Sequence, residues 1–144
     1  IPLYMLAGFV TGERKSAEAG MKYFLFGATT SAIMLFGFSL LYGFSGTTDL
    51  AQIGAALTTS QFPLYLIMAA FVLVLVGFGF KVSAVPFHFW APDVYEGAPT
   101  PITGFLSTAS KAAGFAVLLR FLFAVFPSVI ANWSILIGVI SAVI

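Results

Sequence analysis

Charged residues are scarce in this sequence. Six lysines and arginines and five acidic residues make up 8% of its 144 residues, whereas 60% are hydrophobic. A soluble domain carries about a quarter charged residues, which cover its surface. Because far fewer are present here, lipid must cover most of the surface instead. The composition therefore predicts a polytopic membrane protein or a piece of one.

Other absences narrow the function further. The sequence has no cysteine, which excludes thiolate metal sites, thiol catalysis and disulfides. With a net charge of +1 and no basic run, it gives no indication of a nucleic-acid partner. It contains no metal-ligand cluster, phosphate-binding glycine loop or nucleophile triad. Because it has no initiator methionine and stops inside an apolar run, we expect residues 1–144 to be a single internal fragment of a longer protein.

Long apolar runs predict an all-α, polytopic bundle of transmembrane helices, since each crossing needs ~20 apolar residues. The predicted segments are the end of a helix at 1–10, crossings at 23–42, 62–90 and 102–126, a short interfacial helix at 50–57, and the start of a further crossing at 130–144. The 11–22 loop holds three of the six basic residues. The positive-inside rule then places it on the cytoplasmic side with the 91–101 link, and the 43–61 loop outside.

The third crossing is expected to be discontinuous. The run at 62–90 is longer than one straight crossing needs, and it contains Pro86, which disfavours helix at the residue before it. We predict a break between Ser83 and Pro86 and a resumed helix toward Trp90. Broken backbone at membrane depth is tolerated only where protein buries it or where it lines a wet cavity. Lys81 lies next to this break.

Lys111 lies about ten residues into its predicted helix, which is ~15 Å along the axis and near the middle of a ~30 Å core. Thr103, Ser107 and Lys111 follow the i, i+4, i+8 spacing with Ser110 alongside, so we expect one polar stripe that faces protein. A bland interpretation is open for each lysine: Lys81 snorkels to an interface, and Lys111 pairs with an acid outside the sequence. The functional interpretation is a proton relay, because a desolvated lysine releases its proton more easily. Thr103, Ser107 and Ser110 are possible further members of this relay.

Several residues near the break are secondary candidates. Histidine titrates near neutral pH, so His88 is a candidate for the relay, with a hydrogen-bonded structural role as the alternative. Asp93 and Glu96 are expected to cap helices or to pair with basic residues on a neighbouring segment. The neighbouring aromatic residues are expected to form packing and an aromatic belt; they are Phe87, Phe89, Trp90 and Tyr95.

The run GFKVSAVPFHFWAPDVYEGAPTPITGFLSTASKAAGF at 79–115 resembles the antiporter-like, proton-pumping membrane subunits of respiratory complex I. Its PDVYEGAPTP portion is similar to the subunit N (subunit 2) type, as is EAGMKYFLFGATTSAIMLFGFSLLYG at 18–43. The resemblance implies that Lys81 is the pumping lysine on a broken helix and that Lys111 is the connecting lysine of the proton path. Two further family features, a glutamate on the preceding helix and a lysine on a later broken helix, fall outside the sequence.

The resemblance implies proton translocation as part of an NADH (or related donor):quinone oxidoreductase. The chain itself is expected to bind no redox cofactor, with NADH and quinone used elsewhere in the complex. Its expected partners are other membrane subunits, lipid, protons and water. A bacterial inner membrane is expected, with thylakoid and mitochondrial inner membranes left open. The alternatives are a subunit of a multisubunit cation/proton antiporter or membrane-bound hydrogenase, and a structural membrane scaffold whose lysines form only ion pairs.

Overall fold

A computed structural model of the chain describes residues 2–59 and 62–143. Within these residues the chain forms helices joined by turns, so the predicted all-α class is confirmed. In chain order they are α1 (Pro2–Ala7), α2 (Arg14–Ser45), α3 (Leu50–Thr59), α4 (Leu64–Val82), α5 (Trp90–Gly97), α6 (Thr100–Ser107), α7 (Ala109–Val125), the 3-10 turn η1 (Pro127–Val129) and α8 (Ile130–Val143). Ile1, Ile144 and residues 60–61, which belong to predicted segments, lie outside the described part.

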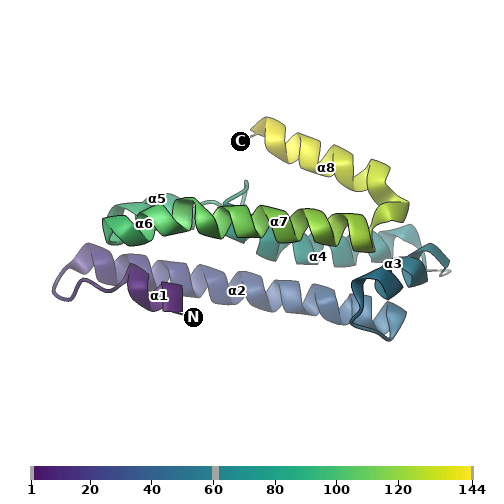
Figure 1. The fold of residues 1–144 in the computed structure, drawn as a ribbon, viewed down its shortest axis with the longest axis horizontal. Helices are drawn as coiled ribbons and strands as arrows, with labels where there is room; N and C mark the ends of the chain where they lie inside the picture. Colours follow the sequence, from purple (N-terminus) through teal and green to yellow (C-terminus); the bar gives the residue numbers. More distant parts are fainter. Residues whose placement is uncertain (1, 60–61, 144) are drawn as a thin grey trace.

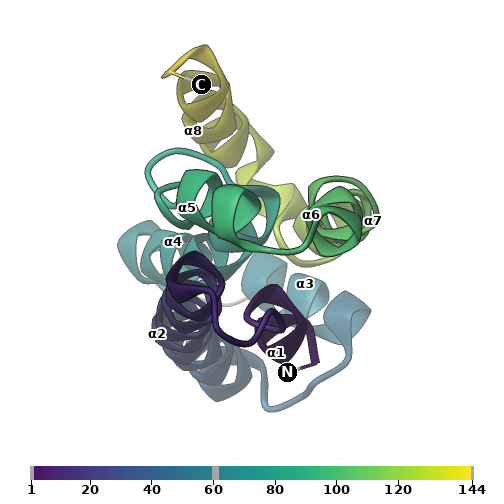
Figure 2. The ribbon, with the colours of Figure 1, turned by 90° about the vertical axis from the view of Figure 1, so that its left-hand side faces the viewer.

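The long helix α2 supports most of the other helices. Helix α4 packs along its C-terminal half, α5 lies along its N-terminal half, and α7 packs on α4 (Figure 1). The end-on view of Figure 2 shows α6 and α7 one behind the other, so together they form one nearly straight rod. Helix α3 lies at the end of the molecule where α2 stops, and α8 diverges from the rest (Figure 1).

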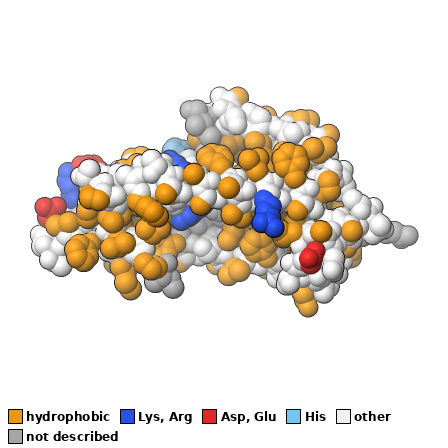
Figure 3. Space-filling model, viewed as in Figure 1, with side chains coloured by type: hydrophobic (Ala, Val, Ile, Leu, Met, Phe, Trp, Pro, Cys, Tyr) orange, Lys and Arg blue, Asp and Glu red, His pale blue; other side chains and the backbone are white. Residues whose placement is uncertain are grey.

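Three helical stretches are long and apolar enough to cross a membrane: Arg14–Ser45, Leu64–Val82 and Thr100–Val125. They correspond to the three complete crossings predicted from the sequence. Orange hydrophobic side chains are spread over the whole face shown in Figure 3, whereas basic and acidic side chains lie together at the end where α2 begins and only singly elsewhere on this face. The chain is thus a multi-pass membrane protein with one markedly charged end.

A glycine allows α2 and α4 to pack closely. A methyl group added at Gly37 would lie 2.8 Å from Cγ2 and 2.9 Å from the backbone nitrogen of Val74. Such distances are too short for real carbon atoms, so only glycine permits this approach of the two helices. Small residues allow such close approach wherever helices pack in a membrane.

Two predicted loops turned out to be helical. Helix α2 begins at Arg14, because the residues before the apolar run are good helix formers and hydropathy locates the membrane rather than the helix end. The predicted 91–101 link contains α5, which extends from Trp90 to Gly97. Pro92 does not prevent this, because it lies in the first turn, where the N–H that proline lacks has no partner within the helix.

The predicted 102–126 crossing is interrupted at Thr108 (φ −113°, ψ −81°), which separates α6 from α7. The hydroxyl groups of Ser107 and Thr108 both donate to the carbonyl of Gly104, at 3.0 and 2.7 Å. Side-chain hydroxyls compete in this way with the backbone bonds of a helix. This interruption, which lies three residues before Lys111, was not predicted from the sequence.

We expect Gly37→Ala and Gly43→Ala to have opposite effects, although both residues lie on α2. The added methyl collides with Val74 at position 37 and meets nothing within 4 Å at position 43. Gly37→Ala should destabilise by ~1–3 kcal/mol, whereas Gly43→Ala should stabilise by ~0.5–1 kcal/mol because alanine favours helix. Thermal unfolding of the purified membrane complex measures both. Equal shifts for the two variants would contradict the close packing.

We expect cysteines at Glu13 and Thr48 to be labelled from opposite sides of the membrane. Both residues are exposed, and they lie at opposite ends of α2. A membrane-impermeant maleimide should label Glu13→Cys in inside-out vesicles and Thr48→Cys in right-side-out vesicles, because the basic end is expected to be cytoplasmic. Labelling of both from one side would refute the topology.

Candidate functional site

The predicted helix interruption lies next to Lys81. Helix α4 ends at Val82 and α5 begins at Trp90, so the chain leaves helical geometry one residue after the lysine. Between the two helices the chain turns through Ser83, and the peptide bond that precedes Pro86 is cis. The break predicted from proline and the resumption at Trp90 are both confirmed.

Three hydrogen bonds satisfy the backbone where α4 ends. The N–H of Ser83 donates to the Phe80 carbonyl (3.2 Å), and the N–H of Ala84 donates to the Gly79 carbonyl (2.8 Å). This pair of bonds is a Schellman motif, which usually has glycine at the left-handed position that Ser83 occupies here with φ 60°. The indole N–H of Trp90 also donates to the Phe80 carbonyl, at 3.1 Å. Trp90 therefore ties the start of α5 to the end of α4.

The side chain of Lys81 lies against α7. A methyl group added at Gly114 would be 3.3 Å from Cγ and 3.7 Å from Cβ of Lys81, so the stem of the lysine lies on bare helix backbone. Gly114 follows Lys111 by three residues, which is about one helical turn. Lys81 is half-buried, and within residues 2–59 and 62–143 it makes no hydrogen bond or ion pair. The fold thus brings the two candidate lysines to neighbouring turns.

Lys111 lies over an aromatic ring. Its Nζ is 5.4 Å from the centroid of the Tyr95 ring, within the range of a cation–π interaction. Lys111 is half-buried, and among the described residues it too lacks a hydrogen bond or ion pair. The Tyr95 hydroxyl is buried without a hydrogen-bond partner in the same part of the chain. Tyr95, which the sequence analysis assigned to packing or an aromatic belt, is therefore in contact with a candidate site residue.

A cavity of about 300 Å³ joins the helix break to Lys111. Its polar lining comes from Ser83, Lys111 and Ser141, and the rest is mostly apolar side chains of α4, α7 and α8. The hydroxyl of Ser83 is buried, and no described residue hydrogen-bonds it. Such a group is normally satisfied by water or by a neighbouring segment. Sequence analysis used Ser83 only to mark the break and missed its place in this cavity.

None of the other relay candidates is among the residues that line this cavity. Thr103 donates at 3.4 Å to carbonyl groups near the α5–α6 turn. Ser107 is exposed and does not line the cavity, whereas Ser110 is buried, with 8% of its surface accessible. His88 lies in the turn between α4 and α5, stacked on Phe89 with ring centroids 4.7 Å apart. Its Nδ1 is buried, with no partner in the described part of the chain.

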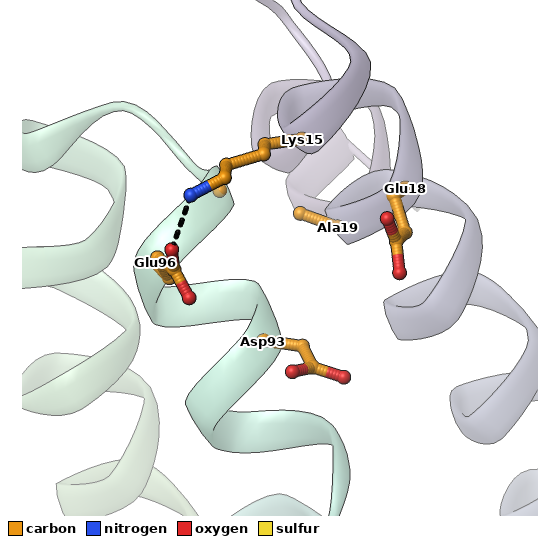
Figure 4. A pocket seen from close by; sticks show the side chains of 6 residues that line it. Lys15, Glu18, Ala19, Asp93 and Glu96 are labelled. Carbon is orange, nitrogen blue, oxygen red and sulfur yellow. Dashed lines mark hydrogen bonds and ion pairs between the residues drawn. The ribbon is translucent and has the colours of Figure 1, made fainter.

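Ion pairs join α5 to the start of α2. The ammonium of Lys15 contacts Glu96 at 2.5 Å, and that of Lys22 contacts Asp93 at 2.6 Å and Glu18 at 2.7 Å. Figure 4 shows Lys15 of α2 reaching across to Glu96, with Asp93 about one turn earlier in α5. The expectation that Asp93 and Glu96 pair with basic residues of a neighbouring segment is confirmed.

Known proteins match the whole chain. The family model described as "NADH:quinone oxidoreductase/Mrp antiporter, TM" matches residues 1–144. The chain belongs to this family. Within the NADH:quinone oxidoreductase/Mrp antiporter family, the chain is 55% identical over 133 residues to NADH-quinone oxidoreductase subunit N of Moorella thermoacetica, covering 92% of this chain and 28% of that protein. It is 51% identical over 138 residues to NAD(P)H-quinone oxidoreductase subunit 2 of Prochlorococcus marinus, covering 96% of this chain and 26% of that protein.

Two solved structures have a similar fold. A chain of respiratory complex I from Thermus thermophilus matches with a TM-score of 0.71 and 44% identity, over 83% of this chain and 26% of that chain. The archaeal membrane-bound sulfane sulfur reductase matches with a TM-score of 0.65 and 29% identity, over 78% of this chain and 23% of that chain. The resemblance to subunit N is confirmed. The chain spans only about a quarter of the length of these relatives.

We expect the Lys22–Asp93 pair to tolerate exchange of its charges but not reversal of one. Lys22→Asp adds a third acid beside Asp93 and Glu18, and Asp93→Lys places two cations together. Each single variant should lower the amount of assembled complex on native gels, and the double variant should recover most of it. Failure of the double variant to recover would show that the pair is not what holds α5 to α2.

Proposed function

We propose that the chain is part of a proton-translocating membrane subunit of an NADH (or related donor):quinone oxidoreductase, and that Lys81 and Lys111 pass protons within it. The observation that carries the proposal is the placement of Lys81 on Gly114, one turn from Lys111, beside a helix break. The 55% and 51% identity to subunits N and 2 favours this class over the more distant membrane-bound reductase at 29%. Electron transfer from donor to quinone takes place in other subunits of such a complex.

Within the described residues, the two candidate lysines differ from the other lysines in having no acid partner. No acid of the described residues pairs with Lys81 or Lys111, whereas Lys15 pairs with one acid and Lys22 with two. An ammonium group with neither an anion nor ample water around it is destabilised relative to the neutral amine. The scaffold alternative, in which the lysines form only ion pairs, therefore requires acids from outside the described residues.

The neighbouring positions of the two lysines couple their charges. Two unit charges ~10 Å apart repel by ~1.7 kcal/mol at an effective dielectric of ~20. A proton that arrives on one lysine thus favours release from the other. The cavity at the break, which Ser83 and Lys111 help to line, offers a path from Lys111 toward the helix break that follows Lys81. His88 and Ser110 lie close enough in the chain to the break and to Lys111 to extend this path, whereas Thr103 and Ser107 are not among the residues that line the cavity.

We expect Lys111→Ala to reduce proton pumping about tenfold or more, the range of a lost proton-transfer group, while the complex still assembles. Lys111→Arg should fail as well, because a guanidinium group does not release its proton in proteins. Proton uptake by vesicles that contain the full complex measures pumping, and a native gel measures assembly. Arg120→Ala, on the same helix and exposed, is the matched control and should pump normally. Normal pumping in both Lys111 variants would reduce this lysine to a structural cation and overturn the relay.

A further inference from the structure

The aromatic ring of Tyr95 is the group that meets the charge of Lys111. The distance of 5.4 Å from Nζ to the ring centroid is within the ~6 Å range of cation–π attraction. Since Lys111 has no hydrogen bond or ion pair with other residues in the described ranges, this ring is its polar partner there. Resting on the proposed function, we propose that Tyr95 is a positioning residue that holds the protonated side chain of Lys111 in place for proton transfer.

The fold directs the two side chains toward each other. Helix α5 runs toward the charged end of the molecule, and after a short turn α6 and α7 run back from it (Figure 1). Side chains on a helix lean toward its N-terminus. Tyr95 on α5 therefore leans toward the helix break, and Lys111 on α7 leans toward the charged end. The tyrosine can thus reach a lysine that lies about three turns into the opposing rod.

Three sets of contacts fix the position of Tyr95. The acids Asp93 and Glu96, close on either side of it in the chain, form ion pairs with α2. The hydroxyl of Thr103 on α6 lies 3.4 Å from the carbonyl oxygen of Tyr95. The ring of Trp90 meets that of Tyr95 edge-on, with centroids 5.9 Å apart. The backbone at Tyr95 is therefore held from α2 and α6, and its ring is held by Trp90 of α5.

A ring suits this role better than a carboxylate. Its quadrupole attracts an ammonium ion but has little hold on the neutral amine. The ring also cannot accept a proton, so it positions the charged lysine without taking the proton from it. Lys111 also lines the cavity that reaches Ser83. The Tyr95 ring and the cavity thus both adjoin the side chain of Lys111. The ring favours its charged form, and the cavity gives room for proton transfer.

The test weakens the ring's negative face without changing its size. In the full complex, residue 95 is replaced by phenylalanine and then by phenylalanine with one, two and three fluorine atoms. Each fluorine withdraws electron density from the ring, so proton pumping should fall stepwise, by about three- to tenfold over the series. Tyr95→Phe should pump nearly normally, because the hydroxyl has no partner among the described residues, and Tyr95→Leu should lose at least as much as the trifluoro variant. Assembly on native gels should stay constant across the nearly isosteric series. The fluorinated variants therefore test the role of the ring even if the leucine variant does not assemble.

The same series in a Lys111→Ala background is the control. There the fluorine steps should have no effect, because the cation is absent. A flat series together with a defective Lys111→Ala variant would overturn the role of Tyr95 and leave the relay intact. A loss of pumping in Tyr95→Phe as large as in Tyr95→Leu would show that the hydroxyl of Tyr95, and not its ring, is the group that matters. Normal pumping of Lys111→Ala would instead refute the proposed function itself.

Discussion

The hydrogen bond from the Trp90 indole to the Phe80 carbonyl joins the start of α5 to the end of α4. It adds a donor at a helix end whose backbone groups have no water available in an apolar environment. A helix end inside hydrocarbon exposes carbonyls that no water can reach, and each one costs several kcal/mol. Trp90 reduces this cost, and its ring stacks on Tyr23 of α2 with centroids 4.8 Å apart. One buried side chain thus joins α4, α5 and α2. The position of Lys81 beside the break depends on this junction.

Much of this arrangement could be predicted from single residues. Pro86 and the excess length of its apolar run located the helix break, because a proline cannot continue an α-helix. The two acids after Trp90, Asp93 and Glu96, pointed to basic partners because unpaired charges near a membrane are costly. Lys81 and Lys111 stood out for the same reason. Each of these predictions rests on a physical constraint on a single residue in an apolar environment: proline lacks an N–H, and an unpaired charge is costly.

The rest could not be predicted, because it depends on which residues meet across helices. The 91–101 segment was predicted as a link, but its Pro92 lies in the first turn of a helix, where the missing N–H is harmless. Thr108 gave no warning of an interruption, since it is the sharing of the Gly104 carbonyl by two hydroxyls that disturbs the helix there. Tyr95 resembled any other aromatic residue of an interfacial belt. Its contact with Lys111 arises only because α5 and α7 run in opposite directions.

The contact of Lys81 with Gly114 has an electrical consequence. Gly114 lies three residues from Lys111, so the stems of the two lysines differ in depth by ~4.5 Å along α7, or about 15% of a ~30 Å hydrocarbon core. A full charge that crosses the membrane does ~2.3 kcal/mol of work per 100 mV, and a charge that moves over the separation of the two stems does about 0.3 kcal/mol of it. Because α4 and α7 run in opposite directions and side chains lean toward the N-terminus of their helix, the ammonium groups are farther apart in depth than the stems. The share of the membrane voltage that acts on the exchange between the lysines is therefore set by how far the two side chains extend.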